Sequence, residues 1–373
     1  MRRALAGFAC GLMLAPAALA KAPVCTTGTL WAGSPDYDDP SLRAKDGQAL
    51  LDVPPLGFRD LLFSGDHLVT AVGPEVWVVD TAAAEPVLER LFGRDGERVA
   101  RPGKCKQARL VNISGLALGP DGSISGADQM SNLIFQITDP FGPDCAVNFL
   151  AGATEPQDVV VPGRPARFGD ADGPGAEAML GSPDWVAVLD DGTIYFIDSS
   201  YDKLKRVLPD AAHTVETVVT LPEGTYFDLK VLNGALYALG QNSVSEGFIV
   251  TIDPASGEVE DFQRGRSDYW LGDGAINVSG LATDGKGLFT TQSGNLLYVP
   301  LKGDIEKIAG TGIWFDYEGD YDPHQPHPAD ELQLIAMRRT QTAGSNVFLA
   351  YHKDALYFSA TGRSPYVMRI DCK

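Results

Sequence analysis

Beyond its first twenty positions, the chain of 373 residues lacks long apolar segments. A helix needs roughly 18 consecutive apolar residues to span a membrane, so the sequence offers no span after that point. Basic residues are also scarce: 30 Lys and Arg stand against 49 Asp and Glu, which gives a formal net charge of -19. Such a charge repels phosphates, so we expect no nucleic-acid partner and no anionic membrane surface.

The motifs of the common enzyme classes are missing as well. The sequence contains no nucleophile elbow, no HExxH, no CxxC, no Gly-rich phosphate loop and no haem-attachment motif. These absences disfavour the enzymes that depend on such motifs. They leave open an enzyme whose site is assembled from residues scattered along the chain.

The first twenty residues, MRRALAGFACGLMLAPAALA, have the pattern of a secretory signal peptide. Arg2 and Arg3 form the basic start, an apolar run follows, and Ala18 and Ala20 are the small residues before Lys21. We therefore expect residues 1–20 to be removed and the protein to be exported, either periplasmic or secreted. Four cysteines would remain in an oxidising compartment, where they could form two disulfides in three connectivities.

Glycine and proline are plentiful, with 41 and 25 residues, which indicates many turns and favours an all-β chain. An apolar strand, a turn and a second apolar strand recur six times, and alternating third and fourth segments follow most copies. The copies begin at or near Phe58, Asn112, Phe168, Tyr226, Asn277 and Asn346. Six four-stranded antiparallel units predict a six-bladed β-propeller.

The sixth copy lacks its fourth segment before the chain stops, but the segment 24–33 resembles the outer strands of other copies. We expect this N-terminal strand to complete the last blade and close the ring, so that residues 21–373 form a single propeller. The placement brings Cys25 beside Cys372 and predicts a disulfide between them. Cys105 and Cys145 form the remaining pair.

One stretch carries a family resemblance. The segment 169–207, GDADGPGAEAMLGSPDWVAVLDDGTIYFIDSSYDKLKRV, is similar to the NHL repeat. It has a Gly-Asp-Gly-Pro-like loop, a Pro before the inner strand, an Asp-Gly turn, Tyr-x-x-Asp and a basic third strand. Roughly half of the chain carries the likeness. It implies a propeller but no single activity, because such propellers include binding scaffolds, lyases and lactonase-like hydrolases.

The loop at the start of this stretch contains Asp170 and Asp172, which could bind calcium. An EF-type loop needs a Glu at its twelfth position, and Gly181 stands there instead. Similar stretches precede two other copies of the repeat. We therefore expect a connector between blades.

Oxygen-bearing side chains recur where each inner strand begins, and these positions face the mouth of a propeller's channel. The six residues are Asp60, Ser114, Asp184, Asp228, Ser279 and Asn346. Two interpretations stay open. The ring could hold a hard cation such as Ca²⁺, or its members could cap the strands beside channel water.

His324 and His327 form a second candidate metal site. They stand three residues apart among acidic residues on a Pro-rich loop. Imidazole and carboxylate groups together suit zinc or copper. An ordinary surface loop is the alternative interpretation.

For function, we expect an exported NHL-like propeller that binds a protein or small-molecule ligand at one face, acts as a monomer and carries no cofactor other than Ca²⁺. The alternative is a metal-dependent, lactonase-like hydrolase or lyase that uses a channel cation as a Lewis acid. Its general base would be Asp184 or Asp228. The six aligned positions include no Glu, which weakens this alternative.

Overall fold

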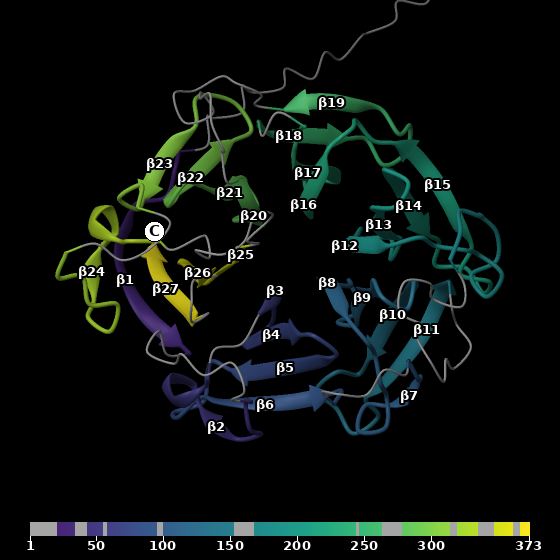
Figure 1. Cartoon of the computed structure of the whole chain (residues 1–373), viewed down its shortest axis with the longest axis horizontal. Coiled ribbons are helices and arrows are strands. Elements are labelled where there is room, and N and C mark those ends of the chain that lie inside the picture. The colour runs from purple at the N-terminus through teal and green to yellow at the C-terminus, as the bar shows by residue number, and fades with distance from the viewer. Residues whose placement is uncertain are drawn as a thin grey trace, which may run out of the picture.

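The computed structural model describes residues 21–33, 43–54, 58–94, 100–152, 168–243, 246–262, 278–313, 319–334, 347–360 and 366–373. Within these ranges the strands form six antiparallel sheets around a central channel (Figure 1). The prediction of an all-β, six-bladed propeller is confirmed. Asn346 and the expected signal peptide lie outside the described residues.

Blades 1 to 3 are built mainly from the first half of the chain, with their strands in order from the channel outward. Blade 1 contains β3 (Arg59–Ser64), β4 (His67–Val72), β5 (Glu75–Asp80), β6 (Val87–Phe92) and β2 (Gln48–Ala49). Blade 2 contains β8 (Ile113–Leu118), β9 (Ile124–Asp128), β10 (Leu133–Thr138), β11 (Ala146–Gly152) and β7 (Gly103–Lys104). Blade 3 contains β12 (Pro183–Val188), β13 (Ile194–Asp198), β14 (Lys203–Val207) and β15 (Val215–Thr220).

Blades 4 to 6 continue the ring in the same order. Blade 4 contains β16 (Thr225–Leu232), β17 (Ala235–Gln241), β18 (Gly247–Ile252) and β19 (Val259–Phe262). Blade 5 contains β20 (Val278–Thr283), β21 (Gly287–Gln292), β22 (Asn295–Pro300) and β23 (Glu306–Ala309). Blade 6 contains β25 (Phe348–His352), β26 (Ala355–Ala360), β27 (Tyr366–Cys372), β1 (Cys25–Ala32) and β24 (His327–Pro328).

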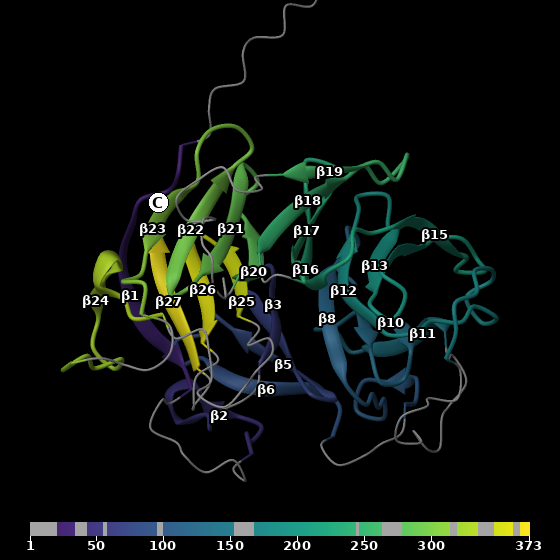
Figure 2. The ribbon, with the colours of Figure 1, turned by 45° about the horizontal axis from the view of Figure 1, so that its top comes forward.

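The inner strands β3, β8, β12, β16, β20 and β25 surround the channel (Figure 2). The second strand of a blade packs against both neighbouring blades, so its residues are buried on both faces. All five residues of β13 are buried, and so are all six of β21. The core therefore consists of layers between blades rather than one central mass.

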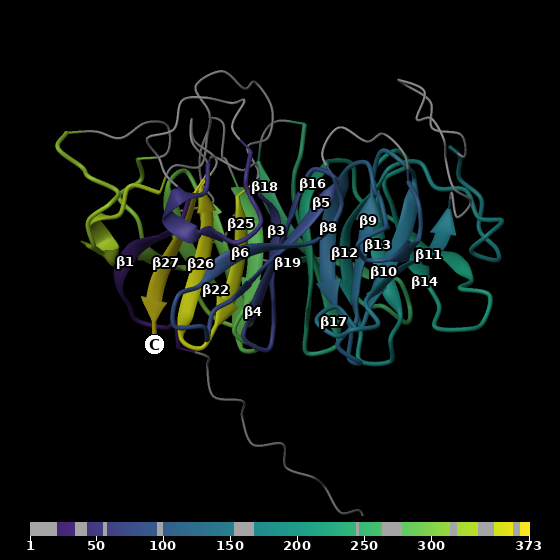
Figure 3. The ribbon, with the colours of Figure 1, turned by 90° about the horizontal axis from the view of Figure 1, so that it is seen from below.

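The ring closes as the sequence predicted. β1 pairs with β27 in an antiparallel register that places Cys25 opposite Cys372, and a disulfide joins the two residues. The first and last described strands thus lie side by side in blade 6 (Figures 1 and 3). The second predicted disulfide, between Cys105 and Cys145, is also present.

Three blades have a fifth strand that the four-stranded repeat did not predict. β2, β7 and β24 are each two residues long and pair with the outer strand of the blade that the chain then enters. In blade 3, a single bridge between Gly173 and Val215 takes the same place. These connectors cover part of an edge that would otherwise leave backbone groups unpaired.

Two short 3₁₀ turns, η1 (Leu50–Asp52) and η2 (Ala329–Glu331), follow β2 and β24. No helix among the described residues is long and apolar enough to cross a membrane.

The two disulfides close loops of very different length, so their removal should cost different amounts of stability. The cysteines are 347 residues apart in the Cys25–Cys372 pair and 40 apart in the Cys105–Cys145 pair. The chain-entropy relation then gives about 6 and about 4 kcal/mol. Denaturant titration of the two Cys→Ser double variants should show the larger loss for Cys25→Ser/Cys372→Ser. A larger loss for the other pair would contradict the ring-closing role.

Candidate functional site

The residues of the predicted oxygen ring that the structure describes all lie on inner strands; four are the second residue of their strand, and Asp228 is the fourth residue of β16. These residues are all buried: Asp60, Ser114, Asp184, Asp228 and Ser279. Asn346 lies outside the described residues. Each of these strands also contains a β-bulge near the ring position. A bulge changes the face taken by the next side chain, so the five positions do not share one environment.

Asp60 and Asp228 join neighbouring blades through hydrogen bonds. Asp60 Oδ2 accepts the backbone N–H of Leu116 in blade 2 at 2.8 Å, and Asp228 Oδ2 accepts that of Leu281 in blade 5 at 2.7 Å. The other oxygen of each carboxylate accepts the N–H of the residue that follows it. Both carboxylates are therefore already held by two backbone donors.

Lys230 supplies the positive charge between these two acids. It extends from β16 in blade 4, and its Nζ lies 2.9 Å from Asp228 Oδ1 and 3.5 Å from Asp60 Oδ1. Blades 1 and 4 face each other across the channel (Figure 1). The ammonium thus occupies the position between carboxylates where the sequence suggested a metal cation.

The pKa values follow from this burial and pairing. Burial raises the pKa of Asp228 to about 6 although the Lys230 ammonium opposes it, and the like charge of Asp60 acts in the same direction as burial. Burial also lowers the pKa of Lys230, but the two carboxylates together raise it above its ordinary value. Lys230 therefore stays charged at neutral pH.

Asp184 has a different environment from Asp60 and Asp228. Its Oδ2 accepts hydrogen bonds from Gln129 Nε2 at 2.8 Å and from Ser199 Oγ at 3.1 Å. Burial raises the pKa of Asp184 to about 6, although hydrogen bonds from Ser114 and Ser199 lower it. No ion pair with Asp184 is found among the described residues. Hydrogen bonds and the positive charge of Arg59 therefore oppose the effect of burial on the pKa of Asp184.

The two serines of the ring make different contacts, one between blades and one within a blade. Ser114 Oγ donates to the backbone oxygen of Pro183 in blade 3 at 3.0 Å. Ser279 Oγ lies 3.4 Å from Thr291 Oγ1 within blade 5.

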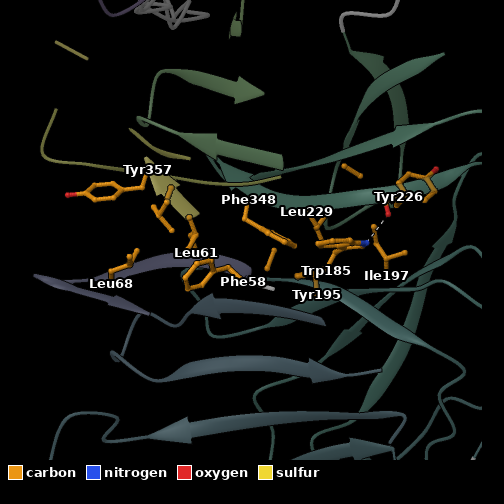
Figure 4. Packing of buried hydrophobic residues seen from close by; sticks show 14 of the residues in the cluster. Phe58, Leu61, Leu68, Trp185, Tyr195, Ile197, Tyr226, Leu229, Phe348 and Tyr357 are labelled. Carbon is orange, nitrogen blue, oxygen red and sulfur yellow. Dashed lines mark hydrogen bonds between the residues drawn. The ribbon is translucent and has the colours of Figure 1, made fainter. Parts of the chain in front are cut away.

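Aromatic side chains from opposite blades meet beside this ring. The rings of Trp185 in blade 3 and Phe348 in blade 6 have centroids 6.2 Å apart, and Phe58 lies beside them (Figure 4). The indole Nε1–H of Trp185 donates to the backbone oxygen of Tyr226 at 2.9 Å, which fixes the indole. The cavity inside the channel has a volume of about 230 Å³, and its lining is mostly apolar apart from Lys230, Thr283 and Tyr351.

The His327 side chain contacts two residues of its own loop, Tyr321 and Asp322, which the sequence did not predict. His327 Nε2 lies 2.7 Å from the backbone oxygen of Asp322, and its ring stacks on Tyr321 with centroids 4.2 Å apart. A carbonyl oxygen can only accept, so this nitrogen carries a proton and is not available to a metal. His327 also belongs to β24, which pairs with β1.

The described part of the chain contains no group of three or more His, Cys, Asp or Glu side chains placed to hold a metal ion. Calcium in the channel and a metal at His324 and His327 therefore stay predictions from sequence. The contacts of Lys230 and His327 favour the alternative interpretation at both places.

The acidic loop of the NHL-like stretch is a connector in the structure. Asp170 forms ion pairs with Lys203 and Lys205. The Lys205 Nζ lies 2.7 Å from Asp170 Oδ1. Asp172 accepts from Lys205 Nζ at 3.0 Å and from the backbone N–H of Thr217 at 2.7 Å. Lys205 is completely buried. The two carboxylates thus attach the connector to β14 and β15.

A larger cavity is lined by residues of both blade 1 and blade 2, among them residues of the outer strands β6 and β7. This rim cleft has a volume of about 800 Å³. Its blade 1 side is formed by His67, Val78, Asp80, Ala83, Val87, Glu89, Arg90 and Leu91. Its blade 2 side is formed by Lys104, Cys105, Lys106, Gln107, Pro140, Phe141, Gly142, Pro143 and Cys145.

Sequence reasoning missed both Lys230 and the rim cleft. A signal for Lys230 was present, because residues two apart on a strand share a face and Asp228 is an expected channel residue. The rim cleft left no comparable signal. It is formed by residues from two blades, and no spacing within one repeat shows how far apart two blades lie.

Comparison with known proteins gives the fold and no family. No protein-family model matches the chain, and no curated protein matches it. The solved structures it resembles include a protein of unknown function from Bacteroides thetaiotaomicron VPI-5482, at 12% identity over 93% of this chain and 76% of that one, with a TM-score of 0.60. An auxiliary nutrient binding protein from Bacteroides ovatus ATCC 8483 matches at 12% identity over 94% and 77%, with a TM-score of 0.58. A streptogramin B lyase matches at 13% identity over 87% and 96%, with a TM-score of 0.50.

The contacts of Lys230 predict that removing its ammonium lowers the free energy of unfolding by an amount that depends on pH. Lys230→Met leaves two buried carboxylates without their partner, so the free energy of unfolding at pH 8 should fall by about 3–5 kcal/mol. The loss should shrink at pH 5, where Asp228 takes up a proton. Denaturant titrations at both pH values test this, with the exposed Lys302→Met as control. An equal loss at both pH values would contradict the ionic role.

Asp184 predicts a second pH effect. Its folded pKa of about 6 lies above the ordinary 3.8, so its protonated form stabilises the fold at low pH, and this stability is lost as pH rises through 6. Asp184→Asn should therefore gain stability relative to the parent chain between pH 4 and 7, by up to about 3 kcal/mol. Thermal unfolding across this range, with the exposed Asp190→Asn as control, would show the trend; a flat difference would mean that the carboxyl does not titrate there.

Proposed function

We propose that this protein is an exported NHL-like propeller that binds a small molecule in the rim cleft and performs no chemistry of its own. Export is inferred from the signal-like residues 1–20, and two disulfides suit an oxidising compartment. Support for the NHL relationship comes from the basic third strand, because Lys203 and Lys205 bind the acidic connector of the same repeat.

The rim cleft is the observation that carries the binding proposal. Its volume of about 800 Å³ falls within the 300–1,000 Å³ typical of ligand sites, whereas the channel cavity of about 230 Å³ does not. The Cys105–Cys145 disulfide belongs to its lining and ties β7 to the start of β11, so this side of the cleft is preformed. A preformed cavity avoids the cost of ordering its walls when a ligand binds.

The channel supports the metal-dependent alternative less well. A cation there would have to displace the Lys230 ammonium from Asp228 and Asp60, and both acids also accept backbone N–H groups. The propeller fold does not decide between the two functions. One neighbour is called a nutrient binding protein and another a lyase, and at 12–13% identity each likeness shows the fold alone.

Binding can be tested by screening a small-molecule library for compounds that raise the melting temperature of the purified mature chain. Phe141 is 41% exposed and lines the rim cleft, so Phe141→Ala should weaken the binding of a hit by at least about tenfold. Phe168→Ala is the matched control, because Phe168 is also an exposed aromatic residue and lies outside the cleft lining. Hits that bind both variants equally would place the site elsewhere.

Elemental analysis of the same sample addresses the alternative. One equivalent of calcium per chain, lost in Asp184→Ala, would support a metal-dependent propeller instead.

A further inference from the structure

The charges in the rim cleft are divided between its two sides. Asp80 and Glu89 lie on the blade 1 side, and Lys104 and Lys106 lie on the blade 2 side. Among the described residues, none of these four side chains forms an ion pair. The opposite charges thus face the same cavity without neutralising each other across it.

The third cationic residue of the lining, Arg90, already has partners within blade 1. Arg90 Nη1 lies 3.0 Å from Glu75 Oε1, and the guanidinium lies over the Trp77 ring at 5.6 Å from its centroid. Arg90 therefore serves the blade 1 sheet. The cationic groups open to a ligand are the two lysines of blade 2, which form a local positive edge on a chain with a net charge of -19.

The rim cleft also offers apolar and neutral polar contacts. His67 and Phe141 stack across the two blades with centroids 4.1 Å apart and planes at 13°, and Pro140 and Pro143 flank Phe141 in the lining. An exposed ring bounded by prolines suits an apolar or aromatic group. The Gln107 amide can both donate and accept, as recognition of a peptide group requires.

From this arrangement we infer that the ligand is a short peptide with free termini, which bridges the rim cleft through charges of both signs. The inference rests on the proposed function. The ligand's ammonium lies toward Asp80 and Glu89, and its carboxylate lies toward Lys104 and Lys106. Its apolar side chain packs on Phe141. A ligand of one sign would leave one pair of charges uncompensated, whereas a dipolar ligand satisfies both.

The probe is the tripeptide Gly-Phe-Gly, compared by calorimetry with its N-acetylated, C-amidated and doubly blocked forms. The free tripeptide should bind most tightly. Loss of either terminal charge should weaken binding about tenfold, as expected for a charge-assisted hydrogen bond, and the doubly blocked form should bind least. Equal affinities for free and doubly blocked peptide would overturn the inference.

Charge-removing variants assign each terminus to a side. Lys104→Gln/Lys106→Gln should weaken the free and N-acetylated peptides but leave the C-amidated peptide unchanged. Glu89→Gln should weaken the free and C-amidated peptides but leave the N-acetylated peptide unchanged. Lys302→Gln and Glu260→Gln are exposed controls outside the rim cleft. An effect of the controls equal to that of the cleft variants would refute the assignment.

The two proposals fail in distinguishable ways. If no tripeptide binds but a library hit depends on Phe141, the peptide inference is wrong and the cleft remains a ligand site. If tripeptides and library hits all fail to bind at Phe141, the proposed function is wrong together with the inference.

Discussion

The antiparallel pairing of β1 with β27 is the constraint on which the rest of the ring depends. Without β1, blade 6 would expose an unpaired strand edge, and the layer between blades 6 and 1 would lose its outer part, including Trp31 and Ala32. Hydrogen bonds between inner strands also join neighbouring blades. Asp60 and Asp228 each accept a backbone N–H from the next blade. The shape of the channel and of the spaces between blades follows from this closure.

Internal ammonium groups recur where the sequence offered clusters of carboxylates. Lys230 lies between Asp228 and Asp60 in the channel, and Lys205 lies between Asp170 and Asp172 beneath a connector. In both places the lysine side chain reaches the carboxylates from its strand. The carboxylates are therefore neutralised without a bound metal ion. Burial makes such pairs costly to break, since removing one partner leaves a charge without water or a counter-ion.

The same features direct the functional interpretation away from the channel and toward the rim. The channel end beside the ring is filled by aromatic rings from opposite blades, and its cavity is small and mostly apolar. The rim cleft is larger, carries charges of both signs on opposite sides and presents an exposed aromatic ring. Binding specificity arises from such convergent polar groups rather than from the fold that supports them.

Local pattern was enough to predict the architecture. Alternating apolar residues, turns such as Asp191-Gly192, and the likeness of segment 24–33 to other outer strands are properties of neighbouring residues, so they could be recognised in order along the chain. The Cys25–Cys372 disulfide followed from strand order alone. Asp60, Asp184 and Asp228 lie on inner strands, but the β-bulges beside them decided which face each side chain takes. The pairing of Lys230 with Asp60, 170 residues away, and the rim cleft between β6 and β7 arose only in three dimensions. Both depend on the distance and angle between blades, which are set by packing across the whole ring and leave no periodic trace in the sequence.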